Sequence, residues 1–222
     1  MKKNISLSSV IIFIGGFLFL SSWPSATSLH ALLFFCTIFF YFWVDYRGNL
    51  LFKKQLALFI VIFVVVGTAF ITEINNRSQG APVFVHDNIL QVEPAIQMLL
   101  QGKNPYIENY FGTELEDFPF VNDHLLVNPA LYHCIKLPFH LVFSTPFYLF
   151  FNNTIHFFDE RLVYIILFIM SSLVLYQLPK KVENKFSLVA AYAFNPLFLR
   201  FFFGGERRCF CFKLVDFNHF FT

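Results

Sequence analysis

The sequence predicts an all-α, polytopic membrane protein with about five to six transmembrane helices and one large extracytoplasmic loop. Its 222 residues are 57% hydrophobic and only 14% charged, and their mean hydropathy is +0.60. A soluble domain of this length could not bury so much apolar surface, so the bilayer is the expected solvent. The net charge of +2 is too small to indicate binding to nucleic acid, and the four cysteines show no disulfide spacing.

Three apolar runs open the chain, at residues 8–23, 28–44 and 55–71. Each is about 17 residues long, near the lower limit for a helix that spans the membrane. The first run follows Lys2 and Lys3 and so also resembles a signal peptide, but further runs follow at once and we expect an uncleaved helix. Residues 1–73 are therefore predicted to form three N-terminal transmembrane helices.

Basic residues set the orientation of these helices. Besides the two N-terminal lysines, Arg47, Lys53 and Lys54 lie between the second and third runs, and positive residues mark the cytoplasmic side. The N-terminus is therefore expected inside the cell, and residues 74–127 outside it as an extracytoplasmic loop with an acidic motif. The expected location is a multi-pass, integral position in a bacterial inner (cell) membrane, with membrane lipid as a partner.

The hydrophobic segment at residues 128–160 is interrupted by Pro138 and Pro146. If it crossed the membrane once, the basic turn that contains Lys180 and Lys181 would lie outside, against the charge rule. We therefore expect a broken or re-entrant segment that returns to the outer face, with its irregular backbone covered by protein or facing water. Residues 161–205 are predicted to form two more transmembrane helices.

The loop carries the densest polar cluster of the chain: His86, Asp87, Gln91 and Glu93. Asp87 or Asn88 could cap a helix that is terminated at Gly102. Asp87 could instead act as a general base toward a sugar hydroxyl, or hold a divalent cation that neutralises a phosphate leaving group. The acidic residues farther along the loop favour a solvated face or weak cation binding, and the histidines lack the spacing of a zinc site.

Other elements have both a structural and a functional interpretation. The motifs that begin at Asn104 and Asn128 are Asn-Pro turns, each followed by an interfacial tyrosine, Tyr106 and Tyr132. They could also form a wall for a lipid-linked donor or a sugar ring. Arg200, near the outer end of the last apolar run, could extend toward water or pair with a phosphate.

Taken together, these residues resemble the multi-spanning glycosyltransferases of the GT-C type, which use a polyprenyl-phosphate sugar as donor, and in particular mannosyltransferases. The matching pattern consists of His86-Asp87, Gln91, Glu93, Gly102-Lys103-Asn104-Pro105-Tyr106, Asn128-Pro129-Ala130-Leu131-Tyr132 and Asn195-Pro196-Leu197, within residues 83–203. Such enzymes carry more spans than this chain predicts, and three helices before the acidic loop is unusual for much of the class.

The resemblance implies an inverting hexosyl or mannosyl transfer on the outer face of the membrane. Asp87 would be the catalytic residue that takes the proton of the acceptor hydroxyl as the lipid phosphate leaves. The resemblance also implies a set of substrate-binding residues: His86, Gln91, Glu93, Asn104, Tyr106, Asn128, Tyr132 and Arg200. No protein metal ligand is assigned, and a divalent cation is the one cofactor considered.

Two other classes compete with the glycosyltransferase. A transporter or channel subunit would need charged or broken helices along a path at the midplane of the membrane, and within the three early runs only His30 titrates. An inactive fragment is the other alternative, because residues 206–222 form an aberrant tail without helical periodicity.

This tail predicts a frameshift near Gly204. Codons of AT-rich usage can be chosen for it that, read one base forward, encode an Asn-Asp pair and then a run that is apolar except for one asparagine. The Cys209–Cys211 pair would then be an accident of frame, and the product as written would lack later spans and activity.

The orientation is testable with reporter fusions. A reporter inserted near Gly102 should be active only outside the membrane, and one inserted beside Lys180 only in the cytoplasm, because basic residues stay inside. Cytoplasmic activity at Gly102 would reverse the topology.

Overall fold

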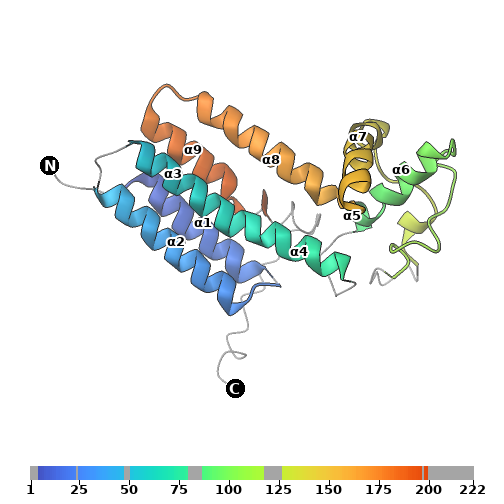
Figure 1. The fold of residues 1–222 in the computed structure, drawn as a ribbon, viewed down its shortest axis with the longest axis horizontal. Coiled ribbons are helices and arrows are strands. Elements are labelled where there is room, and N and C mark those ends of the chain that lie inside the picture. Colours follow the sequence, from blue (N-terminus) through green and yellow to red (C-terminus); the bar gives the residue numbers. More distant parts are fainter. Residues whose placement is uncertain are drawn as a thin grey trace, which may run out of the picture.

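The computed structural model describes residues 5–23, 25–47, 51–79, 87–117, 127–196 and 198–199. Within these residues the chain is all-α, as predicted. His86, Arg200 and the tail at 206–222, for which the sequence made predictions, lie outside the described residues. Figure 1 shows a bundle of long helices at one end and a smaller lobe at the other.

The bundle is built from the apolar runs. Its helices are α1 (Leu7–Ser22), α2 (Ser28–Arg47), α3 (Leu51–Ile62), α4 (Thr68–Ser78), α8 (Glu160–Gln177) and α9 (Val182–Ala193). The π-helical turn η1 (Phe63–Gly67) joins α3 to α4 without a break. Three stretches are long and apolar enough to cross a membrane, judged by length and composition: Ser28–Arg47, Lys53–Ser78 and Glu160–Gln177.

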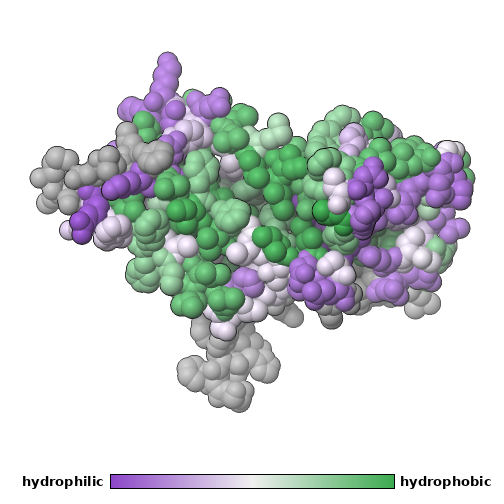
Figure 2. Space-filling view, viewed as in Figure 1, coloured by the Kyte–Doolittle hydropathy of each residue, from purple (hydrophilic) through white to green (hydrophobic). Residues whose placement is uncertain are grey.

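The bundle has apolar side chains on both its inside and its outside. Phe34, Ile38 and Leu58 are buried among the helices, whereas Phe39 and Phe63 are 70% exposed. Figure 2 shows hydrophobic side chains over the middle of the bundle, between polar regions at its far end and on the lobe. An outward apolar surface of this kind suits contact with lipid.

The lobe consists of residues between α4 and α8. It contains α5 (Asp87–Leu90), α6 (Val92–Leu100), the 3₁₀ turn η2 (Pro129–Leu131) and α7 (Pro138–Ile155). A separate apolar core holds these elements together: Val92, Ile96, Tyr110, Leu115, Leu131, Leu141 and Phe158. In Figure 1, α7 lies beside α6, outside the bundle.

Helix α7 differs in detail from the segment that the sequence predicted. Pro138 begins the helix, where its missing N–H costs nothing, and Pro146 lies inside a continuous helix. The helix ends at His156, whose φ of 53° is left-handed. Whether this segment is re-entrant stays a prediction.

A polar contact fixes the end of the bundle that lies away from the lobe. Asp45, near the end of α2, accepts hydrogen bonds from the backbone N–H of Ser6 (3.0 Å) and the hydroxyl of Ser9 (2.6 Å). Lys54 of α3 forms an ion pair with the same carboxylate at 2.6 Å. Three helix termini are thereby held at one point.

Glycine permits a close approach between α1 and α9. A Cβ built on Gly15 would fall inside contact distance of the backbone carbonyl of Phe194, just after α9, and one on Gly16 would overlap the ring of Phe34. By contrast, a Cβ on Gly67 would lie 3.7 Å from the nearest atom, on the ring of Phe63. Only the first two glycines are therefore required by packing.

We expect Gly15→Ala to lower the free energy of unfolding by about 1–3 kcal/mol, because the backbone at Phe194 must move. Gly67→Ala is the matched control, and it should be neutral or stabilising by up to about 1 kcal/mol, since alanine favours a helix. Thermal unfolding in detergent micelles measures both. A Gly15→Ala protein as stable as the wild type would contradict the close α1–α9 contact.

Candidate functional site

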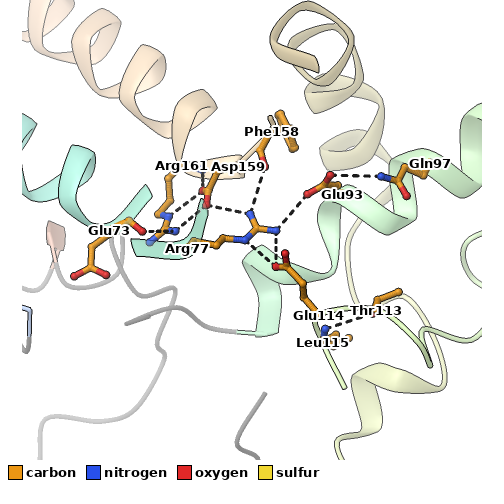
Figure 3. A network of polar contacts seen from close by, with 10 residues as sticks. All are labelled: Glu73, Arg77, Glu93, Gln97, Thr113, Glu114, Leu115, Phe158, Asp159 and Arg161. Carbon is orange, nitrogen blue, oxygen red and sulfur yellow. Dashed lines mark hydrogen bonds and ion pairs between the residues drawn. The ribbon is translucent and has the colours of Figure 1, made fainter. Parts of the chain in front are cut away.

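An ion network that is buried around Asp159 and exposed at Glu114 joins the lobe to the bundle (Figure 3). Arg77, at the end of α4, contacts Asp159 at 3.0 Å, Glu93 at 3.2 Å and Glu114 at 2.9 Å. Asp159, directly before α8, also receives Arg161 at 2.7 Å. The same Nη2 of Arg161 also donates to the backbone carbonyl of Glu73 at 3.2 Å. Helices α4, α6 and α8 thus meet around two guanidinium groups.

Charge compensation keeps Asp159 ionised in this fully buried position. Burial alone would raise the pKa of its carboxyl, but the hydrogen bonds and positive charges of Arg161 and Arg77 outweigh burial and hold the pKa below its ordinary value. A folded-state pKa below the unfolded one stabilises the protein above about pH 3.9. That contribution is lost as the pH falls through the folded-state value.

Glu93 behaves differently in the same network. Burial raises the pKa of its carboxyl, and the nearby Arg77 only partly opposes this effect. Its second oxygen accepts a hydrogen bond from Gln97 at 3.4 Å. Glu93 therefore takes part in the contact between lobe and bundle, on the side of α6.

Asp87, the predicted catalytic residue, lies in the single turn of α5 with 7% of its surface exposed. Its Oδ2 accepts a hydrogen bond from the side-chain amide of Asn128 at 3.2 Å, and the carbonyl oxygen of that amide accepts from the N–H of Ala130. The structure thus brings together two predicted site residues that are 41 positions apart. Asp87 does not cap the helix that ends at Gly102, because α6 begins separately at Val92.

Gln91 holds the lobe together from within. Its side chain is fully buried, donates to the carbonyls of Ala130 (2.7 Å) and His133 (2.9 Å), and accepts from the N–H of Ile135 (2.9 Å). These three bonds fix the segment that carries Asn128. The geometry therefore gives Gln91 a role in positioning this segment.

The remaining predicted site residues lie elsewhere on the lobe. Asn104 accepts from the N–H of Tyr106, whose hydroxyl donates to the carbonyl of Lys136, and both residues line a cavity of about 320 Å³. Tyr132 is 56% exposed and packs edge-on against Phe111. Asn104, Tyr106 and Tyr132 do not lie in one cluster with Asp87.

A larger cavity, of about 610 Å³, lies between the lobe and α8. Its polar lining comes from Asn88, Lys136, His140, Ser144 and Glu160, and its apolar lining includes Phe139, Phe143, Val163 and Leu167. Asn88 is the neighbour of Asp87 in the chain, so the α5 turn forms part of the cavity wall.

Glu160 and Arg77 are not among the site residues that the sequence predicted. A signal for Glu160 was present, because three consecutive charged residues, Asp159, Glu160 and Arg161, stand at the head of an apolar run. Such charges at the edge of a membrane helix are costly unless paired. For Arg77 there was no comparable signal.

In the part of the chain that the structure describes, no group of three or more His, Cys, Asp or Glu side chains is arranged to hold a metal ion. Searches against protein-family models, curated proteins and solved structures found no match to this chain. The resemblance to GT-C glycosyltransferases therefore rests on the sequence motifs alone.

We expect Gln91→Leu to destabilise the lobe by about 1–3 kcal/mol, because it leaves buried carbonyl and N–H groups of residues 130–135 without partners. Gln97→Leu is the matched control, since Gln97 is exposed and has one long contact. Limited proteolysis should cleave the Gln91→Leu variant sooner between residues 127 and 137. Equal resistance of the two variants to the protease would show that the three hydrogen bonds of Gln91, the Gln91 clamp, are dispensable.

Proposed function

We propose that this chain is a membrane glycosyltransferase of the GT-C type, which transfers a sugar from a polyprenyl-phosphate donor to an acceptor hydroxyl on the outer face of the membrane. The observation that carries the proposal is the buried Asp87 carboxylate. It is oriented by Asn128 and lies one residue from a cavity with both polar and apolar walls.

The cavity suits a lipid-linked sugar. Aromatic and aliphatic side chains of α7 and α8 would contact the polyprenyl chain, and the polar side chains at Lys136 and His140 would lie near the phosphate. Because one wall belongs to α8, a stretch apolar enough to span the membrane, a lipid could enter from the bilayer.

In this mechanism the acceptor oxygen attacks the anomeric carbon as the bond to the phosphate oxygen breaks, so the configuration inverts. Asp87 takes the proton of the acceptor hydroxyl, and the lipid phosphate leaves with the bonding electron pair. Asn128 fixes the orientation of the carboxylate through the bond to Oδ2.

The arrangement of the helices supports an outer position for the lobe. The end of α2, the start of α3 and the α8–α9 connection carry basic residues, and they lie at the end of the bundle away from the lobe (Figure 1). Arg77 and Asp159 place the end of α4 beside the start of α8, so the chain between them returns to the side that it left. With basic residues inside, residues 79–159 would be extracytoplasmic.

A transporter or channel subunit is less well supported. The charged contacts of the described bundle lie at its two ends, around Asp45 and around Asp159, whereas a transport path would need them near the midplane.

In an intact form, read one base forward after the Gly204 codon, we expect Asp87→Asn to lower sugar transfer by about 10²–10⁴-fold while membrane insertion is unchanged, because the amide cannot accept the proton. The assay follows a radiolabelled sugar from polyprenyl phosphate in membranes. Asp117→Asn, at an exposed carboxylate of the same loop, is the matched control and should keep wild-type activity.

Because a frameshift is expected, the assay uses two forms of the protein. One is the chain of 222 residues, and the other is encoded by a gene shifted by one base after the Gly204 codon. Absence of transfer by both forms, or full activity of Asp87→Asn, would contradict the proposed function.

A further inference from the structure

Only one of the two carboxylate oxygens of Glu160 has hydrogen-bond partners among the described residues. Its Oε1 accepts hydrogen bonds from Nε2 of His140 and from the hydroxyl of Ser144, both at 2.8 Å. Its Oε2 is buried and has no hydrogen-bond partner among the described residues. Leaving a buried carboxylate oxygen unpaired costs free energy, so such an atom calls for an explanation.

The surroundings of Glu160 indicate what could supply the missing partner. The residue is 1% exposed, and its side chain forms part of the wall of the 610 Å³ cavity. A carboxylate is an acceptor only, so it requires a donor such as a hydroxyl or an ammonium group. His140 and Lys136, which line the same cavity, already supply positive or donor groups and disfavour a ligand ammonium.

The rest of the cavity defines the shape of the ligand. Phe139 and Phe143 of α7, whose rings stack with centroids 5.8 Å apart, form an apolar strip that faces Val163 and Leu167 of α8 across the cavity lining. The polar groups lie at the N-terminal ends of α7 and α8, since His140 and Glu160 belong to the first turns of these helices. A hydroxyl-bearing headgroup with a single alkyl chain matches this division.

We propose that Glu160 is a sugar-binding residue, whose Oε2 accepts a hydrogen bond from a ring hydroxyl of a lipid-linked sugar while the lipid chain lies along Phe139, Phe143 and Leu167. The identity of the sugar carrier rests on the proposed function. The binding site itself does not, because it excludes Asp87. His140 and Ser144 act as positioning residues that hold the other oxygen of the carboxylate in place.

The test is a binding measurement on the full chain in lipid nanodiscs. The probe is a dodecyl glucoside with a diazirine in its alkyl chain, used below its micellar concentration and mapped by mass spectrometry. We expect saturable labelling of residues 139–143 or 163–167. Glu160→Gln should weaken the affinity about tenfold or more, the loss expected for a hydrogen bond to a charged group.

Two variants control for folding and for the proposed chemistry. Glu183→Gln, at an exposed carboxylate in the first turn of α9, should bind the probe as the wild type does. Asp87→Asn should also bind normally, because Asp87 does not line the cavity. Glu160→Gln keeps an Oε1 acceptor for Ser144, and thermal unfolding checks that the variant is folded.

Three results would overturn the proposal: no saturable labelling of the wild type, unchanged affinity in Glu160→Gln, or equal labelling by a dodecanol probe without a headgroup. A dodecyl phosphate probe that binds more tightly than the glucoside and ignores Glu160→Gln would also overturn it, since phosphate would then be the ligand group. Binding as expected without any sugar transfer would refute the proposed function alone.

Discussion

The structure depends on one buried carboxylate, that of Asp159. It accepts the N–H of Arg161 at the start of α8 and pairs with the guanidinium groups of both Arg161 and Arg77. Removing one partner from a buried ion pair typically costs about 3–5 kcal/mol, because a charge is left uncompensated. The network brings the end of α4 to the start of α8, and so the chain between them forms a lobe at one end of the bundle.

The candidate site follows from this junction. The cavity has one wall from the lobe, through Asn88 and the α7 side chains, and another from the bundle, through Glu160 and Val163. If the lobe were free to rotate on the bundle, neither wall would have a fixed partner. Asp87 adds a second level of order, because Asn128 and the Gln91 clamp hold it within the lobe. Placement of the site therefore relies on buried polar bonds, for which water competes less than at an exposed surface.

The sequence predicted what depends on local pattern. Hydropathy located the long apolar helices, and Gly102, with a φ of 74°, follows the end of α6 as expected. The polar motifs of the sequence also singled out Asp87 and Asn128, whose side chains are hydrogen-bonded to each other. The sequence could not predict that Arg77 meets Asp159, since that contact joins residues 82 positions apart and Arg77 has no local signal. The charged run at residues 159–161 marked Glu160, but its unpaired oxygen is visible only when α7 and α8 are placed together.

The most direct test of this account measures amide hydrogen exchange of the lobe in Asp159→Asn. The carboxamide cannot compensate Arg77 and Arg161, so α4 should lose its fixed contact with the start of α8, and α6, which Arg77 holds through Glu93, should loosen with it. We predict faster exchange at residues 92–100, with exchange in the middle of α2 unchanged as the internal reference. Wild-type protection of α6 in this variant would contradict the claim that Asp159 fixes the lobe on the bundle.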